Sequence, residues 1–227
     1  MAYWQHKSQL KGAWDCFIDE TDADVYMFQE GRPLQEMIDG KNMVWNAIGG
    51  KRDWGSGVYS NKYHLSEENI DTQFKGVFTI ASIEKINMTL ISMYGLMTNG
   101  YSVPNLHRIF SDLTFLLNGQ INGKRRIVLG GDLNASTQFD LIQKNNSHQI
   151  FFDRVEDFGL RDVYKLSGCK THIQTLRYKR SKKPWQNDYF FISNTISRKF
   201  KGYKILDNER VREYSDHNMV VIEIEAL

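Results

Sequence analysis

The stretch VLGGDLNAS, residues 128–136, places a carboxylate and a carboxamide one residue apart at the end of an apolar run. Side chains at positions i and i+2 of a strand point to the same face, so Asp132 and Asn134 are expected to be directed at one spot. Both residue types are also common in turns, where their side chains bond to nearby backbone, and this simpler explanation carries equal weight for the pair alone. Other polar residues at strand ends are therefore needed to decide between a shared site and a turn.

Four more polar positions border apolar runs and have side chains that hold cations or move protons. Glu30 follows VYMFQ, Tyr94 follows TLISM, Asp188 precedes YFFIS, and the pair Asp216-His217 precedes the run that begins at Met219. Each position taken singly has an ordinary explanation, such as a solvated strand end, a turn or a core tyrosine. Together, they predict one site that holds a hard cation and handles protons around it.

These residue types suit the transfer of a phosphoryl group from an ester to water. Glu30 and Asp216 offer the carboxylate oxygens that Mg²⁺ prefers, so we predict that they bind Mg²⁺, with Mn²⁺ as the alternative. Asp132 is expected to take a proton from an attacking water, while Asn134 holds or polarises the substrate. A carboxylate beside His217, supplied by Asp188, favours the imidazolium form, which can neutralise a developing anionic oxygen.

The overall composition is that of an ordinary globular protein. The 227 residues are 41% hydrophobic and 25% charged, and 13% are aromatic, which is enough to fill a sizeable core. The chain has no internal repeat, low-complexity tract or Pro/Ser-rich linker, so one domain over residues 1–227 is expected. The net charge of +2 is too small to identify a polyanionic partner by itself.

Cysteine usage and the N-terminal residues bear on the compartment. Cys16 and Cys169 are the only cysteines and lie far apart; a disulfide between them stays open, but sparse usage fits a reducing compartment better. The start, MAYWQHKSQLKG, lacks the apolar core of a signal peptide, and no run approaches the ~18 apolar residues of a membrane span. We therefore expect a soluble, cytoplasmic protein that does not associate with membranes.

The hydrophobic pattern predicts many strands and few helices. Apolar residues recur at helical spacing from Leu10 to Phe17, and a second helix is expected over residues 105–119, with Gly119 as its end. The run 219–227 alternates apolar and polar residues, which is typical of an antiparallel strand with one wet face. Other strands are expected within residues 22–30, 55–60, 76–84, 88–95, 126–131 and 187–193, and an amphipathic stretch around 149–158. This order favours a layered α/β protein with mixed or antiparallel sheets.

The motifs FQE, SMYG, GGDLNAS, NDYFFIS and YSDHNMV occur in this order along the chain, and the series resembles the endonuclease/exonuclease/phosphatase superfamily. Members of that superfamily include exonuclease III-like DNA repair enzymes, deoxyribonuclease I and inositol polyphosphate phosphatases. The resemblance spans residues 22–227, and GDLN and SDH are its most specific parts. It implies a four-layer α/β sandwich, in which two packed mixed β-sheets are flanked by helices and strand ends of both sheets converge on the active site.

The resemblance also implies roles for the residues singled out above. The implied catalytic residues are Asp132, Asn134, Asp188, His217 and Tyr94, and the implied metal ligands are Glu30 and Asp216. Asp132 and Asn134 match a pair that orients or activates the nucleophile, and Asp188 supports His217 at the scissile phosphate. Tyr94 matches a position that holds tyrosine in repair endonucleases and histidine in deoxyribonuclease-like members.

The chain departs from the family pattern near its N-terminus. The family usually opens with a strand ending in an asparagine that helps to bind metal or phosphate. Residues 1–30 contain no asparagine, so either Gln5 substitutes for it or the strand is shortened. Because the remaining site is complete, an active enzyme is the favoured interpretation.

A basic stretch ahead of Asp188 favours nucleic acid as the partner. The run LRYKRSKKPW, residues 176–185, contains no acidic residue. The residues in it predicted to bind substrate are Arg177, Lys179, Arg180, Lys182, Lys183 and Trp185. Such a loop would neutralise phosphates, and Tyr178 or Trp185 could stack on a base. A charge run is more simply a solvated loop, but its place at the rim of the expected site favours a nuclease acting on DNA.

Two alternative functions stay open. The same catalytic core could hydrolyse a phosphorylated small molecule or a lipid headgroup. The missing asparagine motivates the second alternative, a degenerate nucleic-acid-binding module without catalytic activity. The sequence also leaves open whether DNA or RNA is cleaved, and whether cleavage is internal or from an end.

Overall fold

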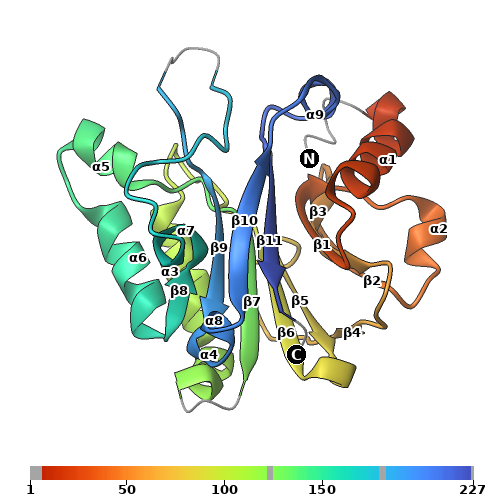
Figure 1. Ribbon diagram of the computed structural model, residues 1–227, viewed down its shortest axis with the longest axis horizontal. Helices are drawn as coiled ribbons and strands as arrows, with labels where there is room; N and C mark the ends of the chain where they lie inside the picture. The colour runs from red at the N-terminus through yellow and green to blue at the C-terminus, as the bar shows by residue number, and fades with distance from the viewer. Residues whose placement is uncertain (1–6, 122–124, 179–182, 226–227) are drawn as a thin grey trace.

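The computed structural model describes residues 7–121, 125–178 and 183–225, and two layers of β-structure pack face to face within it. Helices cover the outer side of each layer, with α3 and α6 on one side and α1 on the other (Figure 1). The predicted four-layer α/β sandwich is therefore confirmed. Its core is formed by large side chains without solvent exposure, such as Phe110, Leu116 and Ile91.

The larger layer is a six-stranded mixed sheet in the order β4-β5-β6-β7-β9-β8. The strands are β4 (Ser66–Glu67), β5 (Phe78–Ile83), β6 (Met88–Met93), β7 (Arg126–Asp132), β8 (Leu160–Asp162) and β9 (Asp188–Ser193). Strands β6 and β7 are parallel, and the other neighbours are antiparallel. The register of β7 and β9 pairs Asp132 with Asp188, so two of the predicted catalytic carboxylates lie on adjacent strands.

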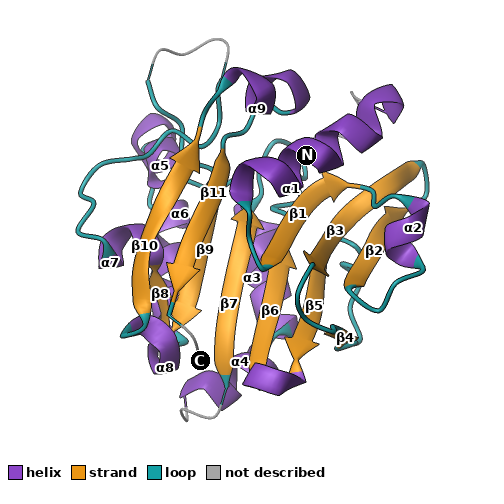
Figure 2. Ribbon diagram, turned by 45° about the vertical axis from the view of Figure 1, so that its right-hand side comes forward, coloured by secondary structure: helices purple, strands orange, loops and turns teal. Residues whose placement is uncertain are grey.

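The second layer consists of two separate antiparallel pieces (Figure 2). One piece has the order β1-β3-β2, and the other pairs β10 with β11. The strands are β1 (Val25–Gly31), β2 (Met43–Gly49), β3 (Arg52–Ser60), β10 (Phe200–Leu206) and β11 (Met219–Ile224). The antiparallel pairing predicted for the last strand is confirmed, and Glu223 on the face expected to be wet is exposed, whereas the apolar residues of both faces are partly buried.

The helices are short and lie mostly in the connections between strands. They are η1 (Lys7–Gln9), α1 (Leu10–Thr21), α2 (Gln35–Ile38), η2 (Glu84–Ile86), α3 (Val103–Asp112), α4 (Thr114–Ile121), α5 (Thr137–Gln143), α6 (Ser147–Asp157), α7 (Val163–Leu166), α8 (Asn194–Ser197) and α9 (Glu209–Tyr214). The single helix expected over 105–119 is wrong, because a turn at Leu113 divides it and the second part continues past Gly119. A glycine in a helix costs only about 1 kcal/mol, which packing readily offsets.

Cys16 and Cys169 are both unpaired, so the structure contains no disulfide between them. No helix in the described ranges is both long enough and apolar enough to cross a membrane.

A close backbone approach joins the ends of β6 and β7 and requires glycine at position 95. The Gly95 N–H donates to the Asp132 carbonyl over 2.7 Å, and a Cβ on Gly95 would lie 1.7 Å from the Leu133 carbonyl oxygen. Gly95→Ala should therefore lower the free energy of unfolding by about 3 kcal/mol or more, measured by urea denaturation. Gly40→Ala is the control, because its Cβ would meet nothing nearer than 3.5 Å. A Gly95→Ala protein as stable as the control would contradict the close approach.

Candidate active site

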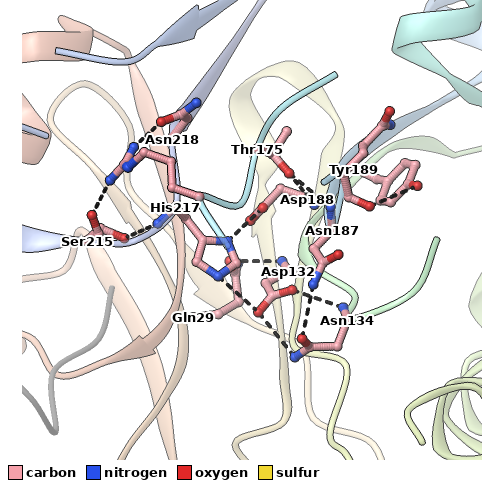
Figure 3. Close-up of polar contacts among 12 residues, drawn as sticks. Gln29, Asp132, Asn134, Thr175, Asn187, Asp188, Tyr189, Ser215, His217 and Asn218 are labelled. Carbon is pink, nitrogen blue, oxygen red and sulfur yellow. Dashed lines mark hydrogen bonds and ion pairs between the residues drawn. The ribbon is translucent and has the colours of Figure 1, made fainter. Parts of the chain in front are cut away.

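Three ionisable side chains from both β layers meet at one end of the sandwich (Figure 3). Asp132 ends β7, Asp188 begins β9, and His217 precedes β11. The Nδ1 atom of His217 lies 2.8 Å from the Asp188 carboxylate, and its Nε2 atom lies 3.9 Å from the Asp132 carboxylate. The imidazole therefore lies between two carboxylates, with one ring nitrogen directed at each.

Asn134 is held beside Asp132 by a tight turn. The strand ends at Asp132, and Asn134 adopts a left-handed backbone with φ of 47°. The Asn134 N–H donates to Asp132 Oδ1 over 2.9 Å, and its side-chain amide donates to Asp132 Oδ2 over 3.2 Å. Asn187 donates to the Asn134 side-chain oxygen over 3.3 Å. The turn explanation for this pair is thus confirmed, and the turn itself brings the two side chains together; their shared role in a site stays a prediction.

The pKa values of Asp132 and His217 are both raised above their ordinary values, but for different reasons. Burial raises the pKa of the Asp132 carboxyl to about 7; the charge of His217 lowers it in part and that of Asp188 adds to the rise. Burial opposes protonation of His217, but the charges of Asp188 and Asp132 outweigh it and raise the pKa of the imidazole to about 9. At neutral pH the site therefore contains an imidazolium beside a carboxyl group poised to exchange a proton.

A pH titration tests this electrostatic arrangement. In the protein without added metal, the His217 imidazole should stay charged past pH 7 and lose its proton near pH 9, as followed by NMR. Asp188→Asn should lower that pKa by more than about one unit, because it removes the closest negative charge. Exposed His64 provides an internal reference in the same spectra. A His217 pKa that does not change in Asp188→Asn would contradict the assigned pairing.

Glu30 and Tyr94 form a second pair at the same end of the molecule. Glu30 lies at the end of β1 with a left-handed backbone, φ of 49°. Tyr94 is 8% exposed, its ring meets Trp54 edge-on at 5.8 Å, and its hydroxyl hydrogen-bonds with Glu30. Burial and the charge of Glu30 raise the pKa of the Tyr94 phenol far above its ordinary value, so the hydroxyl keeps its proton at any working pH.

Buried polar side chains behind these residues hold the strand ends in place. The Thr175 hydroxyl accepts hydrogen bonds from the backbone N–H groups of Asn187 and Asp188, at 2.9 and 3.0 Å. Gln29 accepts from the Asp132 N–H over 3.3 Å and donates to the Ser92 hydroxyl over 2.8 Å. Sequence reasoning missed the supporting role of Thr175 because it lies in a loop without periodicity. Gln29 is adjacent to Glu30, and Asn187 is adjacent to Asp188. This adjacency to predicted site residues is the signal that could have identified them as supporting residues.

Comparisons with known proteins identify the fold. No family model and no curated protein sequence matches the chain. An AP endonuclease from Archaeoglobus fulgidus is similar in structure, with a TM-score of 0.70 at 19% identity over 97% of this chain and 95% of that one. A 3'-5' exonuclease from Neisseria meningitidis has a TM-score of 0.71 at 16% identity over 97% and 96% of the two chains. An AP endonuclease from Leishmania major has 0.73 at 13% identity over 97% and 84%.

The chain has the endonuclease/exonuclease/phosphatase fold. The fold implied by the sequence motifs is thereby confirmed. Within this fold, the motif residues Asp132, Asn134, Asp188 and His217 converge as expected from the sequence. The residue roles implied by the resemblance stay predictions.

The carboxylates that line the cavity at this end of the molecule provide a donor set that fits a divalent cation. Glu30, Asp132, Asp188 and Asp216 all line the same cavity, and hard carboxylate oxygens are the ligands that Mg²⁺ prefers. Within the described part of the chain, the group of potential ligands whose atoms lie within 4.8 Å of one another is Asp132, Asp188 and His217. Glu30 and Asp216 are separate from this group but line the same cavity, so their predicted role as metal ligands stays a prediction.

The basic stretch is anchored next to the site at both ends. Leu176 pairs with both Trp185 and His217 in isolated β-bridges. The two ends of the segment therefore lie next to each other, and its first end lies beside the backbone of His217. Arg177 forms an ion pair with Asp207 over 3.3 Å and hydrogen-bonds with Asn218 and the Ser215 carbonyl. Arg177 therefore joins the basic stretch to the segment around Asp207 and Asn218, a structural role that the sequence did not predict.

Of the other residues predicted to bind substrate, two are described and three lie outside the described residues. Lys183 is exposed, whereas Lys179, Arg180 and Lys182 fall outside the described ranges. Trp185 stacks on Phe139 with ring centroids 5.0 Å apart, and Tyr178 meets it edge-on at 6.2 Å. One face of the indole is thus covered by Phe139. The predicted contacts of this stretch with substrate stay predictions.

Proposed function

We propose that this protein is a metal-dependent phosphodiester hydrolase that cleaves nucleic acid, with DNA as the favoured substrate and Mg²⁺ as the favoured ion. The supporting observation is the constellation of Asp132, Asn134, Asp188 and His217 at one end of the sandwich. The similar solved structures are described as AP endonucleases and an exonuclease. The basic stretch anchored beside His217 adds a means of neutralising a polyanion.

In the proposed reaction a water attacks phosphorus in line with the leaving oxygen. Asp132, with a pKa of about 7, is suited to accept a proton from that water near neutral pH. Asn134 is fixed beside it and directs the water or a phosphate oxygen. His217, held charged by Asp188, neutralises the anionic oxygen that develops in the transition state.

The remaining residues would prepare the substrate and the ion. Tyr94 keeps its proton and so can donate a hydrogen bond to a phosphate oxygen. Glu30 and Asp216, with oxygens from the neighbouring carboxylates, would hold Mg²⁺. When bound, the ion supplies Lewis-acid stabilisation of charge on the phosphate.

A plasmid-nicking assay tests the proposal. Supercoiled DNA should be converted to nicked or linear forms in the presence of Mg²⁺, and excess EDTA should abolish the conversion, because a cavity lined by carboxylates needs a cation before a phosphate can approach. Asp188→Ala, purified in parallel, controls for contaminating nuclease. Folded protein that cleaves no form of DNA or RNA under these conditions would overturn the proposal.

The same preparation separates the alternatives. Release of phosphate from inositol phosphates or nucleotides, with no effect of replacing Lys183 by glutamine, would favour a small-molecule phosphatase. Retained binding of an oligonucleotide, without turnover in the wild type or in Asp132→Ala, would favour a non-catalytic binding module.

A further inference from the structure

The carboxamide of Asn134 is held by the ends of three neighbouring strands. Strands β6, β7 and β9 are consecutive in the larger sheet, and Gly95 comes just after β6, Asp132 ends β7 and Asn187 directly precedes β9. The side-chain amide of Asn134 donates to the Gly95 carbonyl over 3.3 Å and to Asp132 Oδ2 over 3.2 Å. Its oxygen accepts from Asn187 Nδ2 over 3.3 Å (Figure 3). Each strand end therefore supplies one contact to this carboxamide.

These contacts leave the Asn134 carboxamide one hydrogen-bonding position for a ligand. A side-chain amide has two N–H donors, and its oxygen has two acceptor sites. Both N–H groups of Asn134 have partners, whereas its oxygen has one partner among the described residues, Asn187. Asn134 is partly exposed, so a ligand can approach it. A water can donate to the remaining acceptor site, but an ionised phosphate oxygen cannot, because it has no hydrogen.

Asn187 is itself fixed firmly to the turn that contains Asn134. It is 3% exposed, and its backbone N–H donates to the Thr175 hydroxyl over 2.9 Å. Its carbonyl accepts from the Leu133 N–H over 2.9 Å, and Leu133 lies between Asp132 and Asn134. Backbone and side chain of Asn187 thus bind the same turn. A donor held in this way fixes the plane of the carboxamide that it contacts.

The side-chain oxygen of Asn187 makes the choice of asparagine at this position informative. This Oδ1 atom is buried and has no hydrogen-bond partner within the described ranges. A buried acceptor without a partner lowers stability, and leucine has nearly the same shape without that penalty. Local features that are unfavourable for stability are typical of functional sites. The one side-chain contact of Asn187 is the bond to Asn134.

We propose that Asn187 is a positioning residue for the phosphodiester cleavage proposed above, and this inference rests on that function. Its amide holds the Asn134 oxygen so that the remaining acceptor site receives a hydrogen bond from the attacking water. The two hydrogens of the water are then directed at Asn134 and at Asp132, which leaves a lone pair of its oxygen to attack phosphorus. Asn187 thus contributes to the orientation of the nucleophile and not to the binding of substrate.

Single-turnover cleavage of an oligonucleotide by Asn187→Leu tests the proposal. Leucine keeps the shape but removes the donor, so the rate should fall by about tenfold, the scale of one lost hydrogen bond. Affinity for the oligonucleotide without metal should stay within about twofold of the wild type. The free energy of unfolding should not fall, because the unpartnered oxygen is removed as well. Asn187→Ser, whose side chain is too short to reach Asn134, should show the same loss of rate.

A double-mutant cycle separates positioning from a general structural role. In an Asn134→Ala background, Asn187→Leu should change the rate by less than about twofold, because the group that it positions is gone. A residue that merely stabilises the start of β9 would lower the rate by the same factor in both backgrounds. Asn105→Leu is the matched control, since it makes the same exchange at a buried asparagine that donates to the Leu96 carbonyl and the Thr98 hydroxyl. It should lower stability and leave the rate unchanged.

A second readout does not depend on hydrolysis. In the metal-free protein, the NMR order parameter of the Asn134 side-chain amide should fall in Asn187→Leu from the range of rigid groups, about 0.85, toward that of flexible ones, about 0.6. In Asn105→Leu it should equal the wild-type value. An order parameter that does not change in Asn187→Leu overturns the positioning role.

The cleavage data distinguish failure of this inference from failure of the proposed function. If the wild type cleaves and Asn187→Leu cleaves at the same rate, only the inference is overturned. An equal loss of rate in the wild-type and Asn134→Ala backgrounds also overturns it. If the folded wild type cleaves no nucleic acid, the proposed function is overturned and this inference with it.

Discussion

His217→Ala should lower the rate of phosphodiester cleavage by roughly 10²–10⁴-fold, the usual scale for the loss of acid–base or electrostatic catalysis. The imidazole lies 2.8 Å from Asp188 and 3.9 Å from Asp132, and this environment keeps it charged. Alanine removes the positive charge that would face the developing anionic oxygen. Single-turnover cleavage of an oligonucleotide at saturating protein measures the effect on chemistry apart from binding.

Two comparisons make the His217→Ala result specific. His64→Ala, at an exposed position, should cleave at the wild-type rate. Asp188→Asn should retain part of the activity but shift its pH dependence to lower pH, because the imidazole loses its proton more easily without the neighbouring charge. If His217→Ala cleaves as fast as His64→Ala, the role assigned to the imidazole is wrong.

The sequence predicted the central part of the site because those residues occupy strand ends. Asp132 and Asp188 border strongly apolar runs, and the register of β7 and β9 then places them opposite each other. His217 lies two residues before the last strand, so its position follows from the same pattern. A strand end is a position that a hydrophobic pattern identifies, and this is why the convergence of these side chains could be anticipated.

The residues that support the site could not be predicted in the same way. Thr175 is fully buried and bonds to two backbone N–H groups, but it lies in an irregular segment that no pattern distinguishes. Arg177 was assigned to substrate from the charge run around it, yet the structure directs it to Asp207, Asn218 and Ser215. Charge in a sequence predicts the sign of a local field, whereas the partner of each charge depends on tertiary contacts.

Fold elements with mixed patterns were missed for a related reason. Strand β10 has Lys201 and Lys204 among its apolar residues, and β2 is interrupted by Asn46, so neither has a continuous apolar run. Both strands form because each pairs with a neighbour, β11 or β3, that has a stronger strand pattern. Propensity is a weak guide where pairing with another strand supplies most of the stabilisation.

Asp132→Asn should abolish most of the activity while making the folded protein more stable at pH 8. The rate of cleavage should fall by roughly 10²–10⁴-fold, because the amide cannot accept a proton from water. Burial raises the pKa of Asp132 from its ordinary value to about 7, even with the attraction of His217 included. Above pH 7 the folded protein therefore carries a buried charge that costs free energy, and asparagine removes this cost.

The sign of the pH dependence follows from the same shift. Between its unfolded pKa near 3.8 and its folded pKa of about 7, Asp132 is protonated in the folded chain and ionised in the unfolded chain. Its contribution to stability is fully present below pH 3.8 and is lost as the pH rises through 7. Asp132→Asn should thus gain on the order of 2 kcal/mol over the wild type at pH 8, and less at pH 5.

Urea denaturation of the metal-free proteins at both pH values measures this difference. Asp188→Asn is the matched control with the opposite sign, because it removes the carboxylate that hydrogen-bonds to the charged His217 and should destabilise the protein at pH 5. An Asp132→Asn protein less stable than the wild type at pH 8 would show that the ionised carboxylate is held by more favourable contacts than those observed. The predicted pairing of lost activity with gained stability would then be wrong, and Asp132 would have the properties of a structural anchor for the turn at Asn134.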